Sequence, residues 1–221
     1  MKKEQKKLSS RSKILDIDPV YPGTDAIRRA AEIIEHGGIV IFPTACLYGL
    51  AADAMNGDAV RKIYDIKKRP AENPILVLVE NLEAVKTITV SIPPAAKRIM
   101  KQFWPGNVTL IFEANTNMPS ITTAGTGKIG IRMPGHEVAM ALAKQTKRPL
   151  TGTSANISNT AGCSRISDIE PEIVDRVDLV LDAGTLKGGA GSTVADVTAT
   201  PPEILREGTI AAADILKCLD Y

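Results

Sequence analysis

The chain has 221 residues, 44% of them hydrophobic, and a formal net charge of +2. This composition favours a globular protein with one sizeable core, more probable as one domain than as two. No apolar run approaches the roughly 20 residues of a membrane span, and the N-terminus lacks the apolar core of a signal peptide, so we expect a cytoplasmic protein without a membrane partner. Three widely spaced cysteines and two histidines fit neither a disulfide framework nor a zinc centre.

The N-terminal segment is the most basic part of the chain. Six Lys or Arg and one Glu lie in the first thirteen residues, and the remainder is mildly acidic. We expect residues 1–20 to form a flexible basic tail, followed by one domain over residues 21–221. Such a tail either binds nucleic acid through its phosphates or only solubilises the terminus, and the pattern modestly favours the second.

Helical and strand patterns alternate along the rest of the chain. The first helix is predicted to start at Thr24 and to stop at Gly37. Further helices are predicted over residues 58–68, 93–103, 137–146, 171–177 and 211–219. Strands are predicted over residues 38–44, 75–79, 108–113, 129–132, 149–153, 178–181, 192–197 and 204–207. This alternation predicts an α/β fold, with one open, twisted, mixed sheet and helices on its faces.

A cluster of cations ends the second helix. Lys67, Lys68 and Arg69 precede Pro70, which must end the helix, and an Asn-Pro corner leads into the next strand. Cations are also favourable at any helix C-terminus, so taken alone the cluster indicates an ordinary charge-complemented helix end more than an anion site. Other polar clusters at strand ends favour the interpretation as an anion site, because ligands of α/β proteins bind at the ends of strands.

Those other clusters each allow two interpretations. Arg132, at the end of a strand, either binds a carboxylate or phosphate bidentately or forms a structural ion pair. Ser154 and Asn156 either contact phosphate or ribose or belong to an ordinary polar turn, the commoner outcome. Arg206 either faces a nucleotide or lies on an edge strand.

Motifs for several common chemistries are missing. The sequence has no P-loop, no GxGxxG after a strand, and no Ser-His-Asp or Cys-His set. It is rich in cations and hydroxyls at strand ends and poor in general bases. That combination suits chemistry by positioning and charge neutralisation, such as transfer at a nucleotide phosphorus.

Seven ordered segments together resemble the YrdC family of threonylcarbamoyl-adenylate synthases. They are GGIVIFPTACLYGLAAD, KKRPAENP, FWPGNVT, GIRMP, SAN, STVADV and LREG, and they span about residues 25–210. The resemblance implies a twisted open sheet with a concave basic cavity. It also implies condensation of L-threonine, bicarbonate and ATP to L-threonylcarbamoyl-AMP and pyrophosphate, with Mg²⁺ held largely by phosphates and water. The product serves tRNA modification, so tRNA or the threonylcarbamoyl-transfer complex is an implied partner.

The resemblance also implies roles for individual residues. Lys67 and Arg69 would be catalytic, holding and neutralising the ATP phosphates. The other implied nucleotide contacts are Asn73, Ser154, Asn156 and Arg206. The implied threonine contacts are Thr44, Cys46, Arg132 and Ser192.

The chain departs from the family pattern on the threonine side. Ala45 and Cys46 stand where the family has a carboxylate and a hydroxyl, and Leu78 stands where a histidine is common. A thiol still donates weakly, so threonine binding can survive. Two alternatives stay open: a carbamoyl-adenylate-forming enzyme with a different substrate, and a non-catalytic RNA-binding relative. The extra C-terminal domain of longer relatives is expected to be absent.

Overall fold

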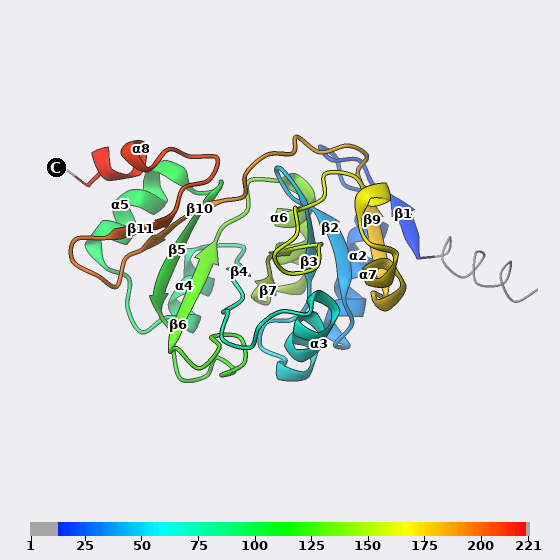
Figure 1. The fold of residues 1–221 in the computed structure, drawn as a ribbon, viewed down its shortest axis with the longest axis horizontal. Coiled ribbons are helices and arrows are strands. Elements are labelled where there is room, and N and C mark those ends of the chain that lie inside the picture. Colours follow the sequence, from blue (N-terminus) through cyan, green and yellow to red (C-terminus); the bar gives the residue numbers. More distant parts are fainter. Residues whose placement is uncertain (1–12, 220–221) are drawn as a thin grey trace, which may run out of the picture.

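A computed structural model describes residues 13–219 and places their strands in two mixed sheets (Figure 1). The five-stranded sheet has the order β1-β9-β2-β3-β8 and the six-stranded sheet the order β11-β10-β5-β6-β4-β7. The strands of the first are Ile14–Asp16 (β1), Val40–Pro43 (β2), Tyr48–Ala51 (β3), Thr153–Ser154 (β8) and Leu179–Asp182 (β9). Those of the second are Val77–Leu78 (β4), Val108–Glu113 (β5), Lys128–Arg132 (β6), Leu150–Thr151 (β7), Thr193–Asp196 (β10) and Glu203–Arg206 (β11).

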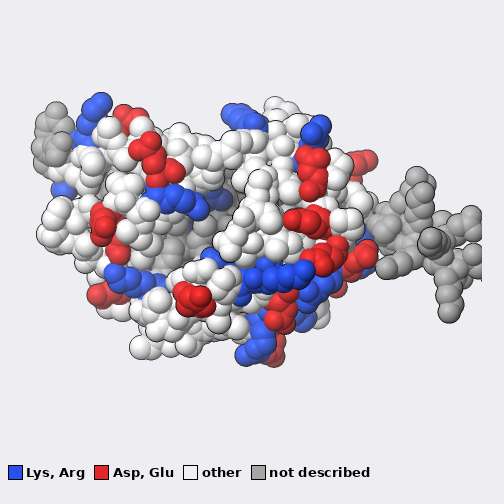
Figure 2. Space-filling view, in the orientation of Figure 1, with Lys and Arg blue, Asp and Glu red and all other residues white. Residues whose placement is uncertain are grey.

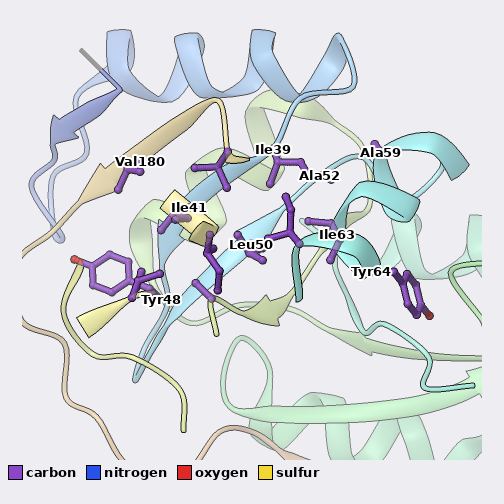
Figure 3. Close-up of a cluster of buried hydrophobic side chains, with 14 of the residues drawn as sticks. Ile39, Ile41, Tyr48, Leu50, Ala52, Ala59, Ile63, Tyr64 and Val180 are labelled. Carbon is purple, nitrogen blue, oxygen red and sulfur yellow. The ribbon is translucent and has the colours of Figure 1, made fainter. Parts of the chain in front are cut away.

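Helices cover both faces of the five-stranded sheet. Thr24–Glu35 (α2) and Glu137–Thr146 (α6) pack on one face, and Gly57–Lys67 (α3) and Pro171–Arg176 (α7) pack on the other. In α2 the buried residues Ile27, Ala30, Ala31 and Ile34 recur at helical spacing, which forms the apolar stripe that meets the sheet. Figure 3 shows the cluster between β2, β3 and α3, with Ile41 and Leu50 on the strands and Ile63 on the helix.

The six-stranded sheet has helices on one face. The helices are Leu82–Ile88 (α4), Pro94–Phe103 (α5) and Ala212–Lys217 (α8). Every second residue of β5 is in the core on this face: Val108, Leu110 and Phe112. They belong to one cluster with Ala96, Ile99 and Met100 of α5, Val85 of α4 and Ile215 of α8. The residues between them on β5 therefore face the opposite side. That second face is turned toward the five-stranded sheet. The two sheets are linked where Thr151 N of β7 donates to the carbonyl of Ala52, the residue after β3, at 2.9 Å.

The α/β class and the mixed strand directions are confirmed, but the strands form two sheets where one was expected. Two further differences concern short elements. Strand β3 and helix α4 are not among the predicted elements. Strand β1 lies inside the segment expected to be a flexible tail: Ile14, Leu15 and Asp16 pair in parallel with β9. A three-residue strand is too short to produce a periodic signal. Residues 1–12 of the expected tail lie outside the described residues.

Within residues 13–219, no helix is both long enough and apolar enough to cross a membrane.

Candidate functional site

A cavity of about 400 Å³ lies between the two sheets. Its volume is in the range of small-molecule sites. Figure 2 shows the hollow on this face of the molecule, with Lys and Arg side chains at its margins. The residues that line it are Thr44, Cys46, Leu47, Tyr48, Gly49, Arg69, Pro74, Leu76, Asn107, Thr109, Ile111, Gly130, Arg132, Gly152, Thr153, Ser154, Gly191, Ser192, Val194 and Arg206.

Strand alternation builds the floor of the cavity. Asn107, Thr109 and Ile111 come from every second position of the β5 segment, and the intervening residues face the helices. The neighbouring strands contribute alternate residues in the same way: Gly130 and Arg132 from β6, and Ser192 and Val194 from the β10 segment. The β2–β3 loop and β8, both of the five-stranded sheet, line the side of the cavity that faces this floor.

Arg132 is the most deeply placed cation of the cavity. Its exposed fraction is 7%, and its Nε is buried without a hydrogen-bond partner among the described residues. Burial is the main reason that the pKa of its guanidinium is lowered to about 10. The nearby Cys46 raises this pKa, and the charge of Arg206 lowers it further. The group therefore stays charged at neutral pH. A buried guanidinium with an unused donor is a site for an anion, because leaving it unpaired is costly.

Arg69 reaches the cavity because of how α3 ends. Lys68 adopts a left-handed conformation at φ 49°, and the N–H of Arg69 bonds to Tyr64 O at 2.9 Å. The guanidinium then closes the following loop, with Nε donating to Asn73 O at 3.0 Å and Nη2 to Pro74 O at 2.7 Å. Asn73 is exposed and is not among the residues that line the cavity, and Arg69 bonds to its backbone carbonyl.

Lys67 lies elsewhere than its expected role requires. Its side chain is buried, at 2% exposure, and it is not among the cavity-lining residues. Its Nζ donates to Ser154 O at 2.5 Å, Asn156 O at 2.7 Å and Asn156 Oδ1 at 3.4 Å. The reason is helical spacing: Lys67 is four residues after buried Ile63, on the packed face of α3. The expected direct contact with phosphate is thus replaced in the structure by contacts with the turn after β8.

Two predicted nucleotide contacts accept hydrogen bonds from Lys67: Ser154, the last residue of β8, and Asn156, in the turn that follows. Ser154 lines the cavity and donates through Oγ to Asn156 Oδ1. Asn156 is buried, and its Nδ2 donates to Ile157 O and Thr160 O, both at 2.8 Å. Asn156 therefore shapes the turn, while Ser154 lines the cavity with its hydroxyl and carbonyl held by Asn156 and Lys67.

The position of Lys67 predicts a pH dependence of stability. Burial lowers the pKa of its ammonium to about 8, and the charge of Arg69 acts in the same direction. Between pH 8 and the ordinary lysine pKa of 10.5, the unfolded chain binds more protons at this lysine than the folded chain, so this group makes the free energy of unfolding rise with pH. Denaturant titrations at several pH values in this window give the free energy of unfolding as a function of pH. Its slope against pH should be more positive in the wild type than in Lys67→Met. Identical slopes in the two proteins would contradict the prediction.

Arg206 and Ser192 form one wall with Thr109. The Nη2 of Arg206 donates to Ser192 O at 2.7 Å, and the hydroxyls of Ser192 and Thr109 are 2.8 Å apart. Arg206 is exposed on β11, at the cavity margin. Arg206, Arg69 and Arg132 thus approach one cavity, whose lining residues include no Asp or Glu. Such a site attracts anions.

The β2–β3 loop provides the opposite wall. Thr44 lines the cavity, and its Oγ1 donates to Leu47 O at 2.6 Å, which closes the loop. Cys46 also lines the cavity, at 9% exposure. Three residues depart from the family pattern, and of these Cys46 alone is among the residues that line the cavity. Ala45 is absent from the lining, and Leu78 packs in the core with α2 and α6.

Asn107 and Thr109 are site residues that the sequence analysis did not single out. Both were within a segment recognised only as a family match. Their signal was available, because they are polar residues at alternate positions beside the apolar run of β5.

The structure offers little to bind a metal directly. Among residues 13–219 there is no group of three or more His, Cys, Asp or Glu side chains suited to a metal ion. The cavity supplies hydroxyls and cations, which do not fit a divalent cation as a ligand set.

Comparisons with known proteins identify the family of the chain. Residues 32–208 match the Sua5/YciO/YrdC family model, which is described as telomere recombination. Threonylcarbamoyl-AMP synthase of Pyrococcus abyssi is 35% identical over 193 residues, covering 87% of this chain and 57% of the relative. The synthase of Bacillus subtilis is 36% identical over 199 residues, covering 90% of this chain and 58% of the relative.

A solved structure gives the same result. The crystal structure of P. abyssi Sua5 complexed with L-threonine superposes with a TM-score of 0.89 at 33% identity, covering 94% of this chain and 61% of that one. The chain spans a little over half the length of the two synthases. With a family model that covers most of its residues and a matching fold, the chain belongs to the Sua5/YciO/YrdC family.

Proposed function

We propose that this protein condenses L-threonine, bicarbonate and ATP to L-threonylcarbamoyl-AMP and pyrophosphate, for the threonylcarbamoyladenosine modification of tRNA. The observation that carries the proposal is buried Arg132, whose Nε has no hydrogen-bond partner within residues 13–219, in a cavity that two further arginines approach. Names of relatives add to it: two are threonylcarbamoyl-AMP synthases, and one structure holds L-threonine.

The chemistry follows from the distribution of charge. The threonine amine and bicarbonate give an N-carboxylate with loss of water. One oxygen of this carboxylate attacks the α-phosphorus of ATP, the new O–P bond forms, and the bond to the β-phosphate breaks with release of pyrophosphate. Among the described residues, the cavity lining includes no His, Asp or Glu that would act as a general base. Catalysis therefore rests on positioning and on neutralising phosphate charge.

Each residue has a part in this arrangement. Arg132 binds the threonine carboxylate deep in the cavity. Arg69 and Arg206 neutralise the phosphates, and Ser154 contacts the nucleotide from the turn that Lys67 holds. Mg²⁺ would come with ATP as part of the substrate and would supply further neutralisation of the phosphate charge, without a ligand set from the cavity residues.

Arg69 gives the simplest test of the phosphate side. Arg69→Glu should reduce turnover by at least about 100-fold, because it removes one cation and adds a charge that repels the phosphates. Arg61→Glu is the matched control, since Arg61 is exposed on α3 and pairs only at the surface with Asp58. Pyrophosphate release and ATP binding would be measured for both variants. Equal activities in the two variants would contradict the role of Arg69.

Pyrophosphate release tests the proposal as a whole. The purified protein would be given ATP and Mg²⁺, with L-threonine and bicarbonate each present or omitted. The proposal predicts release only when both are present. Release that is independent of either substrate would contradict it.

Cys46 supports a second candidate, a carbamoyl-adenylate-forming enzyme for a different amine. A thiol in the cavity wall is a weaker hydrogen-bonding group than a hydroxyl. Replacing L-threonine by other amino acids in the same assay separates the two candidates. We propose tRNA or the threonylcarbamoyl-transfer complex as the partner that receives the product. A non-catalytic RNA-binding role would instead be favoured if the protein bound RNA in a salt-sensitive way and released no pyrophosphate.

A further inference from the structure

Asn107 belongs to the polar floor of the cavity. In the parallel pairing of β5 with β10, Val108 is level with Thr193, so one step back along both strands sets Asn107 beside Ser192. The backbone supports this position, because Thr193 N donates to Asn107 O at 3.0 Å. Thr109 follows two residues later on the same face. Asn107 therefore borders both hydroxyls of the floor.

The same floor places Asn107 near the anion site. In the antiparallel pairing of β5 with β6, Leu110 is opposite Ile131, so the next pair sets Thr109 opposite Arg132. Directly opposite residues of such a pair have Cβ atoms about 5 Å apart. Asn107, Thr109 and Arg132 thus follow one another across the floor. Asn107 and Arg132 therefore line the same floor of one cavity.

The carboxamide of Asn107 has unused hydrogen-bonding capacity. Its recorded side-chain contact among the described residues is Nδ2 to Cys46 Sγ at 4.0 Å, a weak interaction with a poor acceptor. The hydroxyls of Thr109 and Ser192, in contrast, already bond to each other at 2.8 Å. Asn107 is half-buried, and its carboxamide offers both donor and acceptor to the cavity.

We propose that Asn107 is a specificity-determining residue, whose carboxamide hydrogen-bonds the side-chain hydroxyl of the amino-acid substrate. The inference rests on the proposed function for the identity of that substrate. On the opposite wall stands Cys46, a thiol that gives little discrimination, so Asn107 supplies the recognition. A site built around such a bond rejects an analogue that lacks the hydroxyl, because the amide is then left unpaired.

Valine is the matched analogue, since it replaces the hydroxyl of threonine by a methyl group of similar size. Asn107→Leu removes the amide and keeps the side-chain volume. Its kcat/KM for L-threonine should fall by about tenfold or more, with little change for L-valine, so the preference for threonine over valine should fall by a similar factor. Asn117→Leu is the control, because Asn117 is exposed and outside the cavity. It should keep both values.

Titration calorimetry of L-threonine and L-valine, without ATP, gives a second reading that does not depend on turnover. Loss of threonine affinity in Asn107→Leu, with valine affinity and thermal unfolding unchanged, is the expected result. Equal losses for both amino acids would assign Asn107 a structural role and overturn the inference. An unchanged threonine preference would overturn it as well. If the wild type binds threonine but releases no pyrophosphate, the proposed function fails while the binding data still decide the role of Asn107.

Discussion

Replacing Arg132 by methionine should abolish use of L-threonine while leaving the fold at least as stable. The guanidinium is buried and its Nε has no partner among the described residues. Burying a charge without a partner costs stability, so an apolar side chain of similar length relieves that cost. The substrate carboxylate loses its charged partner, and kcat/KM for threonine should fall by at least about 100-fold.

Two measurements on the same variant separate these effects. Titration calorimetry would follow L-threonine and ATP separately, and thermal unfolding would follow stability. Arg165→Met is the control, because Arg165 is an exposed arginine paired with Asp168 three residues away. It should retain threonine affinity and stability. Threonine affinity that survives in Arg132→Met would show that the carboxylate binds elsewhere.

Replacing Lys67 by methionine should lower both stability and turnover. The buried ammonium donates to Ser154 O and to two oxygens of Asn156, and methionine leaves these acceptors without it. Buried acceptors that lose their partner cost about 1–3 kcal/mol each, so we expect the free energy of unfolding to fall by about 2–4 kcal/mol. The loosened turn no longer fixes Ser154, and ATP-dependent turnover should fall with it.

The adjacent lysine provides the control. Lys68 is exposed, and its Nζ pairs at the surface with Glu172 at 2.7 Å. Such pairs contribute little, so Lys68→Met should change the free energy of unfolding by less than about 1 kcal/mol. Denaturant unfolding and pyrophosphate release would compare the two variants. If Lys67→Met kept full turnover and stability, Lys67 would have no positioning role.

Long periodic segments were predictable from the sequence. The bounds of β5 and α6 match the predicted ranges, because each has an uninterrupted pattern of one period. Strand β3, Tyr48–Ala51, was missed because it follows a tight loop within a segment that lacks alternation. All four of its residues are buried, so no polar face marks it as a strand.

Part of the site required tertiary structure. The sequence indicated that Arg132, Ser154 and Arg206 would lie at strand ends, and the structure brings all three to one cavity. It did not indicate that the cavity forms between two sheets. Lys67 shows the limit most clearly: its charge suggested a ligand contact, whereas its place on the packed face of α3 makes it a buried support.

The identity of the product tests the central claim most directly. The protein would be incubated with carbon-labelled bicarbonate, ATP labelled at the α-phosphate, Mg²⁺ and L-threonine, and the products would be separated rapidly and analysed by mass spectrometry. The account predicts one compound that carries both labels and the mass of threonylcarbamoyl-AMP, formed only when threonine is present. An adenylate without the bicarbonate carbon, or the same compound formed without threonine, would contradict it.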